Sequence, residues 1–168
     1  MTRRLRILAI LAVGALLVEN LLDFPLSVPA MRRLAGGLPL LDMRLWYDHQ
    51  AVSQLFAALG ANGRAAYLHL LWSVDLILPF LFAAFLSEAI RIGRFSRLSL
   101  VPVAAALSDY AENLAITVLL LQYPRISALV FLSATLTLLK WIGYVSSIVI
   151  AIAGRLMRKH PLRRVASS

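Results

Sequence analysis

The chain has 168 residues, of which 61% are hydrophobic and only 15% are charged. Its mean hydropathy of +0.81 lies outside the usual range of soluble domains and is typical of membrane proteins. The net charge of +9 does not indicate nucleic-acid binding, because no basic surface interleaved with aromatic residues accompanies it. The chain has no cysteine, which excludes disulfides, thiol catalysis and thiolate metal sites.

Four apolar segments are long enough to cross a bilayer, namely 7–27, 65–90, 98–122 and 126–154. Each exceeds the ~20 residues that cover about 30 Å of hydrocarbon in a helix. The sequence therefore predicts an all-α integral membrane protein, a four-transmembrane-helix bundle that forms a single transmembrane domain over residues 1–168. Only Tyr123, Pro124 and Arg125 separate the last two segments, so we expect an antiparallel hairpin there.

The positions of the basic residues predict the orientation of the chain. Basic clusters precede the first segment, join the second to the third, and follow the fourth: Arg3, Arg4 and Arg6; Arg91, Arg94 and Arg97; Arg155, Arg158, Lys159, Arg163 and Arg164. With four crossings all three clusters fall on one side, which the positive-inside rule assigns to the cytoplasm. We therefore predict a multi-pass protein of the cell (inner) membrane with both termini cytoplasmic, a basic cytoplasmic tail at 155–168 and an external loop at 28–64.

A secretory signal peptide is an alternative interpretation of the first segment. A basic start precedes an apolar stretch, and small residues such as Val28 and Ala30 follow it, as at a cleavage site. Cleavage would leave three crossings. Glu19, Asn20 and Asp23 argue against cleavage, because a cleavage region has small residues in an extended conformation and these residues are larger and polar.

The external loop contains the pattern of a short amphipathic helix. Asp48 is a suitable N-cap for a helix over 49–59, and Gly60 is a suitable C-terminal stop. One apolar face recurs at helical spacing and consists of Val52, Leu55, Phe56 and Leu59. We expect this helix to lie on the outer leaflet, to pack on the bundle, or to close as a lid over an outward-facing site. Trp46 and Tyr47 indicate an aromatic anchor at the headgroup level.

Charged residues inside the predicted crossings are the main functional signal. An ionised side chain at the bilayer centre costs at least ~2.5 to 3.5 kcal/mol, so such residues face a bundle interior or a wet cavity. The polar residues are Glu19, Asn20 and Asp23 in the first segment, Asp75 in the second, Asp109, Glu112 and Asn113 in the third, and Lys140 in the fourth. One lysine neutralises only one carboxylate, so at least one acid that shares its cavity must carry a proton near neutral pH.

The spacing of these residues predicts a polar interface between the last two helices. Asp109, Glu112 and Asn113 share one helical face, and hydroxyl groups at Ser133, Thr137, Tyr144 and Ser147 flank Lys140 on the next helix. Because the two helices form a hairpin, we expect Asp109 or Glu112 to meet Lys140 at a similar depth. Such a pair can also serve only to fix the register of the helices.

Two further residues of the second segment lead to hypotheses of their own. His69 is most simply structural, with a proton pathway or a metal ligand as alternatives. Pro79 is expected to bend the helix and to free a backbone carbonyl inside the bundle. No pattern in the sequence identifies a metal site or a cofactor.

Asp23 at the end of the first segment, the amphipathic outer connection, and Asp75 followed by Pro79 and Phe80 form a pattern that resembles the EXPERA group. These four-helix membrane proteins include sterol isomerases and related binding proteins. The resemblance covers roughly the first half of the chain, and Lys140 has no counterpart in it. It implies a cavity for a lipid-like or amine ligand, with Asp23 and Asp75 as an acidic pair inside.

Three functional hypotheses follow. In the first, the site opens toward the outer side and binds a hydrophobic or lipid-like small molecule, or transforms it by acid/base chemistry. The second is a small proton- or cation-coupled transporter that acts as a homodimer, and the third is a non-catalytic assembly factor. In the first hypothesis the catalytic groups are Asp75, Asp109, Glu112 and Lys140, and the ligand-binding groups are Glu19, Asn20, Asp23, His69, Asn113, Thr137 and Tyr144. Clustering of polar groups toward one side favours the first hypothesis.

Overall fold

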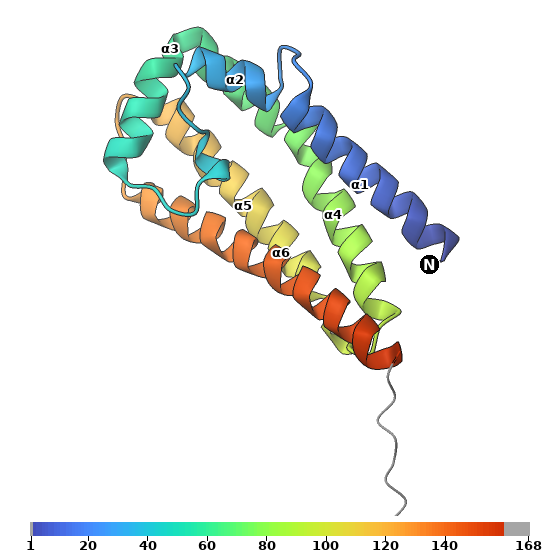
Figure 1. The fold of residues 1–168 in the computed structure, drawn as a ribbon. Helices are drawn as coiled ribbons and strands as arrows, with labels where there is room; N and C mark the ends of the chain where they lie inside the picture. Colours follow the sequence, from blue (N-terminus) through green and yellow to red (C-terminus); the bar gives the residue numbers. More distant parts are fainter. Residues whose placement is uncertain (1, 160–168) are drawn as a thin grey trace, which may run out of the picture.

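The computed structural model describes residues 2–159, and every regular element within this range is a helix (Figure 1). The long helices are α1 (Arg3–Leu21), α3 (His49–Leu71), α4 (Val74–Arg91), α5 (Val101–Gln122) and α6 (Leu129–Lys159). The short ones are α2 (Val28–Leu34) and the 3-10 turns η1 (Leu41–Met43) and η2 (Ser96–Leu98). The predicted all-α class is confirmed for this part of the chain. The predicted basic tail beyond Lys159, with Arg163 and Arg164, lies outside the described residues.

Helices α5 and α6 pack against each other along their length, which confirms the predicted hairpin. Helix α4 packs against both, and α1 packs against α4. A methyl group added at Gly143 would lie 2.7 Å from the Cβ atom of Ala105, well inside the ~3.5 to 4.0 Å at which carbon atoms pack. The absence of a side chain at Gly143 therefore sets how closely α5 and α6 approach.

Three helical segments are long and apolar enough to cross a membrane, and they cover residues 49–91, 96–122 and 129–158. Helix α1 is not among them, because its 19 residues include three arginines and Glu19. Three of the four predicted crossings thus have a suitable helix, and α1 as the first crossing stays a prediction.

The predicted second crossing, 65–90, lies within one of these segments, but two helices share it instead of one continuous helix. Helix α3 ends at Leu71, and α4 begins at Val74. Side-chain hydrogen bonds hold the intervening residues: the Trp72 indole donates to the Thr117 hydroxyl (2.9 Å), and the Ser73 hydroxyl donates to the His69 carbonyl (2.5 Å). Contacts with α5 and a local capping bond therefore stabilise the break.

The predicted first crossing, 7–27, is too long at its C-terminal end. Helix α1 ends at Leu21, and Ser27 instead caps α2 by accepting a hydrogen bond from the backbone N–H of Ala30 (3.2 Å). Helix α2 was not predicted, although a serine N-cap followed by Pro29 in the first turn is a typical helix start.

The predicted amphipathic helix at 49–59 is the first part of α3. The Asp48 carboxylate accepts a hydrogen bond from the backbone N–H of Ala51 (2.8 Å), and Gly60 leaves the helical path with φ 62° and ψ −174°. The apolar face that was predicted is buried: Val52, Leu55, Phe56 and Leu59. This segment is therefore part of a core.

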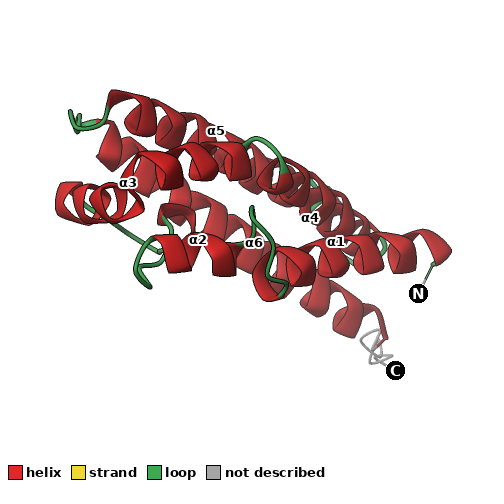
Figure 2. Ribbon diagram, turned by 90° about the horizontal axis from the view of Figure 1, so that it is seen from above, coloured by secondary structure: helices red, strands yellow, loops and turns green. Residues whose placement is uncertain are grey.

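Two apolar cores lie at opposite ends of the molecule (Figures 1 and 2). The first, here called the loop core, joins α2, η1 and α3 to the ends of α5 and α6 that meet at the hairpin turn. The second consists of Leu5, Ala89, Ile90 and Ala151. It brings together the start of α1, the end of α4 and the last part of α6. The described residues of all three basic clusters lie at this second end, which we call the basic end.

We predict that charge at position 56 unfolds the loop core. Phe56 is fully buried and packs edge-to-face on Tyr123 with ring centroids 5.9 Å apart. Replacing it with lysine removes this packing and buries a charge without a partner, so Phe56→Lys should lower the free energy of unfolding by at least ~3 kcal/mol. The neighbouring Gln54 is exposed, and Gln54→Lys should change it by less than ~0.5 kcal/mol. Unfolding in detergent, followed by circular dichroism, measures both values. Equal tolerance of the two changes would show that α3 does not belong to the core.

Candidate functional site

Lys140 forms ion pairs with two carboxylates in the interior of the protein. Its Nζ atom lies 2.7 Å from Glu112 Oε2 and 3.2 Å from Asp109 Oδ1. None of the three residues is more than 6% exposed. The predicted pairing of α5 with α6 is confirmed, and both acids take part where only one was expected. We call these three residues the Lys140 cluster.

The hairpin places the members of the cluster at the same depth. Asp109 and Glu112 stand about one turn apart on α5 and therefore share a face, while Lys140 reaches between them from α6. The close approach at Gly143 lies about one turn further along α6. On the same interface the Ser108 hydroxyl donates to the Leu136 carbonyl (3.0 Å). These contacts fix the register in which the charges meet.

Hydroxyl groups from α6 bind the remaining oxygen of each acid. The Thr137 hydroxyl donates to Glu112 Oε1 (2.5 Å), and the Tyr144 hydroxyl donates to Asp109 Oδ2 (3.3 Å). The predicted hydroxyl stripe around Lys140 is therefore present and faces the acids. Buried charges are stable only when such hydrogen bonds accompany the ion pair.

The outer loop also reaches this network through Tyr47. Its hydroxyl lies 2.6 Å from Ser133 Oγ and 3.3 Å from Thr137 Oγ1, and burial raises the pKa of this phenol to about 12. Tyr47 therefore stays protonated at neutral pH. The prediction that Tyr47 anchors the chain at the headgroups is wrong, because its ring is buried in the loop core.

Asp75 binds an amide instead of the lysine. Asn113 Nδ2 donates to Asp75 Oδ2 (2.9 Å), which ties α4 to α5, and both residues are buried. The Asn113 Oδ1 atom has no hydrogen-bond partner in the described part of the chain. Asp75 thus lies beside the Lys140 cluster as a buried acid whose partner among the described residues is neutral.

A cavity of about 240 Å³ adjoins these residues. Its polar lining combines Asn20, Asp42, Asp75, Asp109, Lys140 and Tyr144. Its other lining residues are all apolar and come mainly from α4 and α6. Asp42 was missed by the sequence analysis. It lies on η1, where it accepts a hydrogen bond from the buried Tyr67 hydroxyl (2.7 Å). Tyr67 is 25 positions further along the chain, so no local pattern could have revealed this contact.

Two predicted site residues are exposed at the surface and do not line the cavity. Asp23 pairs with Arg33 at the surface (2.6 Å), where both side chains are more than half exposed. His69 is exposed on α3 and does not line the cavity. The acidic pair of Asp23 and Asp75 that the EXPERA resemblance implied is therefore not formed. Because α1 ends at Leu21, Asp23 leaves the helix and meets its partner in solvent.

Two further predicted ligand-binding residues lie on the last turn of α1. Glu19 is buried, and its Oε2 atom has no hydrogen-bond partner within the described residues. Asn20 lines the cavity and donates to the Leu16 carbonyl (3.0 Å). Among residues 2–159, no three histidine, aspartate or glutamate side chains are arranged to hold a metal ion.

Comparison with protein families, curated proteins and solved structures gives no match for this chain. The chemistry of the site itself is therefore the basis for proposing a function.

We predict that removal of Lys140 and removal of one of its acids compensate each other. Lys140→Met leaves two buried acids without a counter-charge, which should cost about 1 to 3 kcal/mol if the acids escape by taking a proton. Adding Glu112→Leu or Asp109→Leu should restore part of this loss, because neutral packing can replace a buried ion pair. A double-mutant cycle on the free energy of unfolding measures the coupling.

The exposed pair of Asp23 and Arg33 is the matched control for this cycle. Surface ion pairs contribute about 0 to 1 kcal/mol, so Asp23→Leu with Arg33→Met should show weak coupling. Purely additive losses in both Lys140 double variants would mean that these groups do not interact in the folded protein.

Proposed function

We propose that this chain is a multi-pass membrane protein that binds a hydrophobic or lipid-like small molecule in the cavity beside the Lys140 cluster. The observation that carries the proposal is the composition of this cavity. It is mostly apolar, yet Asp42, Asp75, Asp109 and Lys140 converge on it. Apolar walls with a few convergent polar groups are typical of small-molecule sites.

The apolar surface of the helices supports placement in a membrane. Large apolar side chains are exposed along α1 and α6, including Ile10, Leu17, Ile142 and Val149. A surface of this kind is unusual for a soluble monomer and suits contact with lipid. We infer four crossings, in which α1 joins the three longer apolar segments, and a cytoplasmic location for the basic end.

The rim of the cavity supports a hydrophobic ligand. Leu16 on α1 and Trp141, Val145 and Ile148 on α6 line the cavity and are each more than one third exposed. In a bilayer these side chains would border the lipid. A hydrophobic molecule would enter sideways between α1 and α6, without first crossing water.

Asp75 and Asp109 suit acid/base chemistry on such a molecule. Both line the cavity, but Lys140 and Tyr144 bind Asp109, whereas the partner of Asp75 within residues 2–159 is the amide of Asn113. Asp109 thus has a cationic partner and Asp75 a neutral one among the described residues. We therefore assign the base role to Asp109 and the acid role to Asp75. Two acids in different environments are the usual basis of paired acid and base roles.

A proton- or cation-coupled transporter, acting as a homodimer, is the second candidate, because the buried acids outnumber the lysine. A through-path requires polar groups at several depths. Toward the basic end, the buried polar side chains of the described residues stop at Ser147, whose hydroxyl donates to the Gly143 carbonyl of its own helix (2.6 Å). This distribution favours a binding site over transport.

We predict that a bulky residue at position 16 prevents ligand binding. The protein, purified in mild detergent, should retain a hydrophobic small molecule that mass spectrometry identifies. Leu16→Trp fills the rim of the cavity and should lower retention at least about tenfold, equivalent to ~1.4 kcal/mol. Leu17→Trp is the matched control, since Leu17 is similarly exposed on the same helix but does not line the cavity. Equal retention by the two variants, or no retained molecule in the unmodified protein, would contradict the binding function and favour a transporter or a non-catalytic assembly factor.

We also predict the topology of the chain from its basic end. A reporter inserted after Arg94, between α4 and α5, should read cytoplasmic, and one near Gly37, between α2 and η1, should read external. A reporter fused after Arg164, beyond the described residues, should also read cytoplasmic. Alkaline phosphatase and green fluorescent protein fusions distinguish the two sides. An external signal at Arg94 would reverse the orientation.

A further inference from the structure

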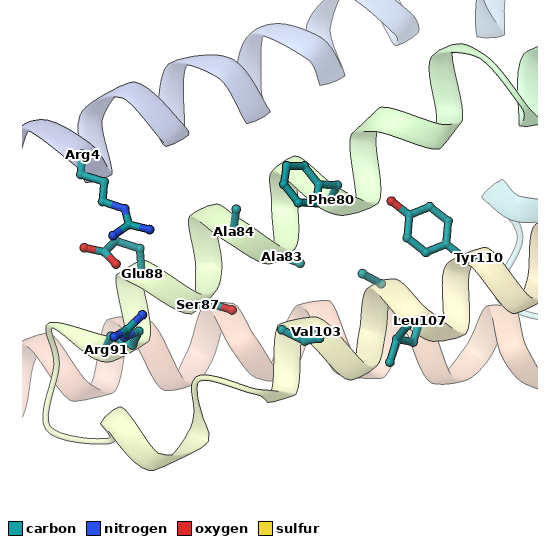
Figure 3. A pocket seen from close by; sticks show the side chains of 11 residues that line it. Arg4, Phe80, Ala83, Ala84, Ser87, Glu88, Arg91, Val103, Leu107 and Tyr110 are labelled. Atoms are coloured by element: carbon teal, nitrogen blue, oxygen red, sulfur yellow. The ribbon is translucent and has the colours of Figure 1, made fainter.

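A second hollow lies at the basic end of the molecule, along α4 and α5 and beside the start of α1 (Figure 3). It has a volume of about 350 Å³ and shares no lining residue with the cavity beside the Lys140 cluster. Most of its wall is apolar and includes Phe80, Ala84, Val103 and Leu107. We call it the basic-end groove.

The wall of the groove offers no unused hydroxyl group. The Ser87 hydroxyl donates to the Ser99 carbonyl (2.8 Å), and the Tyr110 hydroxyl donates to the Leu76 carbonyl (2.9 Å). Polar groups that are already bonded do not favour a polar occupant. From Arg91 to Phe80, α4 rises roughly 16 Å at about 1.5 Å per residue. This length equals about half of the ~30 Å hydrocarbon core, which is the depth of one leaflet.

The polar end of the groove carries an excess of positive charge. Arg4 and Arg91 lie there with Glu88 beside them (Figure 3). Neither arginine belongs to any ion pair formed among residues 2–159. One carboxylate cannot neutralise two guanidinium groups, so the groove carries a net positive charge at this end. Guanidinium groups bind phosphate oxygens through paired N–H donors.

We propose that the basic-end groove binds an anionic phospholipid of the cytoplasmic leaflet. Its phosphate contacts Arg4 and Arg91, and one acyl chain lies along the apolar wall toward Phe80. Because Arg4 belongs to α1 and the wall belongs to α4 and α5, the bound lipid tethers α1 to the rest of the bundle. This site is independent of the small-molecule cavity, and its occupant differs in kind from a ligand there.

The test is a lipid titration of the full-length protein in mild detergent, followed by native mass spectrometry. Phosphatidylglycerol and phosphatidylcholine with the same acyl chains are the probes. The unmodified protein should bind one phosphatidylglycerol saturably and at least about tenfold more tightly than phosphatidylcholine, since each basic residue contributes ~1 kcal/mol toward an anionic headgroup. Arg4→Gln with Arg91→Gln should remove that preference. Arg94→Gln with Arg97→Gln is the matched control, with the same charge change at the same end but outside the groove, and should keep most of it.

A second variant tests the acyl-chain position separately. Ala84→Phe fills the groove and keeps both arginines, so it should weaken the binding of both lipids. Leu107→Trp, at the exposed edge of the same wall, serves the same purpose if Ala84→Phe does not fold. If both double arginine variants lost the phosphatidylglycerol preference equally, the binding would be diffuse electrostatic attraction to the surface and not a specific site. Undiminished binding in the filled groove, or equal competition by inorganic phosphate, would also overturn the lipid site.

Discussion

The pairing of Lys140 with Asp109 and Glu112 is the constraint on which the arrangement of this protein depends. Taking ionisable groups out of water is costly, and the cost is offset only where the partners meet in good geometry with further hydrogen bonds. Helices α5 and α6 provide that geometry in one register, which the Gly143 contact and the hydroxyl groups of Thr137 and Tyr144 reinforce. A shift of one helical turn, about 5.4 Å, would separate the charges and set them against apolar side chains. The Lys140 cluster and its hydroxyl partners therefore fix the register of α5 and α6, and with it the relative positions of the two apolar cores.

The same polar groups explain why the outer loop folds back onto the helices. Tyr47 bonds to Ser133 beside the cluster, and Asp42 reaches the neighbouring cavity while Tyr67 holds it in place. The loop core thus covers the charges from one end, and the helices surround them on the sides. In the part of the chain that the structure describes, Asp75 forms no ion pair. The result is an apolar cavity with unequal acids on its wall, which is the basis for proposing a hydrophobic ligand and acid/base chemistry.

The features that could be predicted from the sequence depend on local periodicity. Asp109 and Glu112 share a face by spacing, and a short turn brings Lys140 opposite them, so the central contact followed directly. The buried face of residues 49–59 followed in the same way. The contacts that were missed join distant residues: Tyr47 and Ser133 are 86 positions apart, and no periodic pattern connects them. The break at Trp72 depends on Thr117 of another helix. Asp23 was placed in the site because α1 was expected to continue to residue 27, but the helix ends at Leu21 and Asp23 meets Arg33 in solvent.

The most direct test of the central contact is a distance measurement at Lys140 in the full-length protein. Solid-state NMR in lipid bilayers, with nitrogen-15 on the lysine side chain and carbon-13 on the aspartate and glutamate carboxyl groups, reports which acids lie within a few ångströms of Nζ. The structure predicts dipolar coupling of Lys140 to two carboxyl carbons, one lost in Asp109→Asn and the other lost in Glu112→Gln. Coupling to neither acid, or to an acid outside this pair, would contradict the account of how α5 and α6 meet.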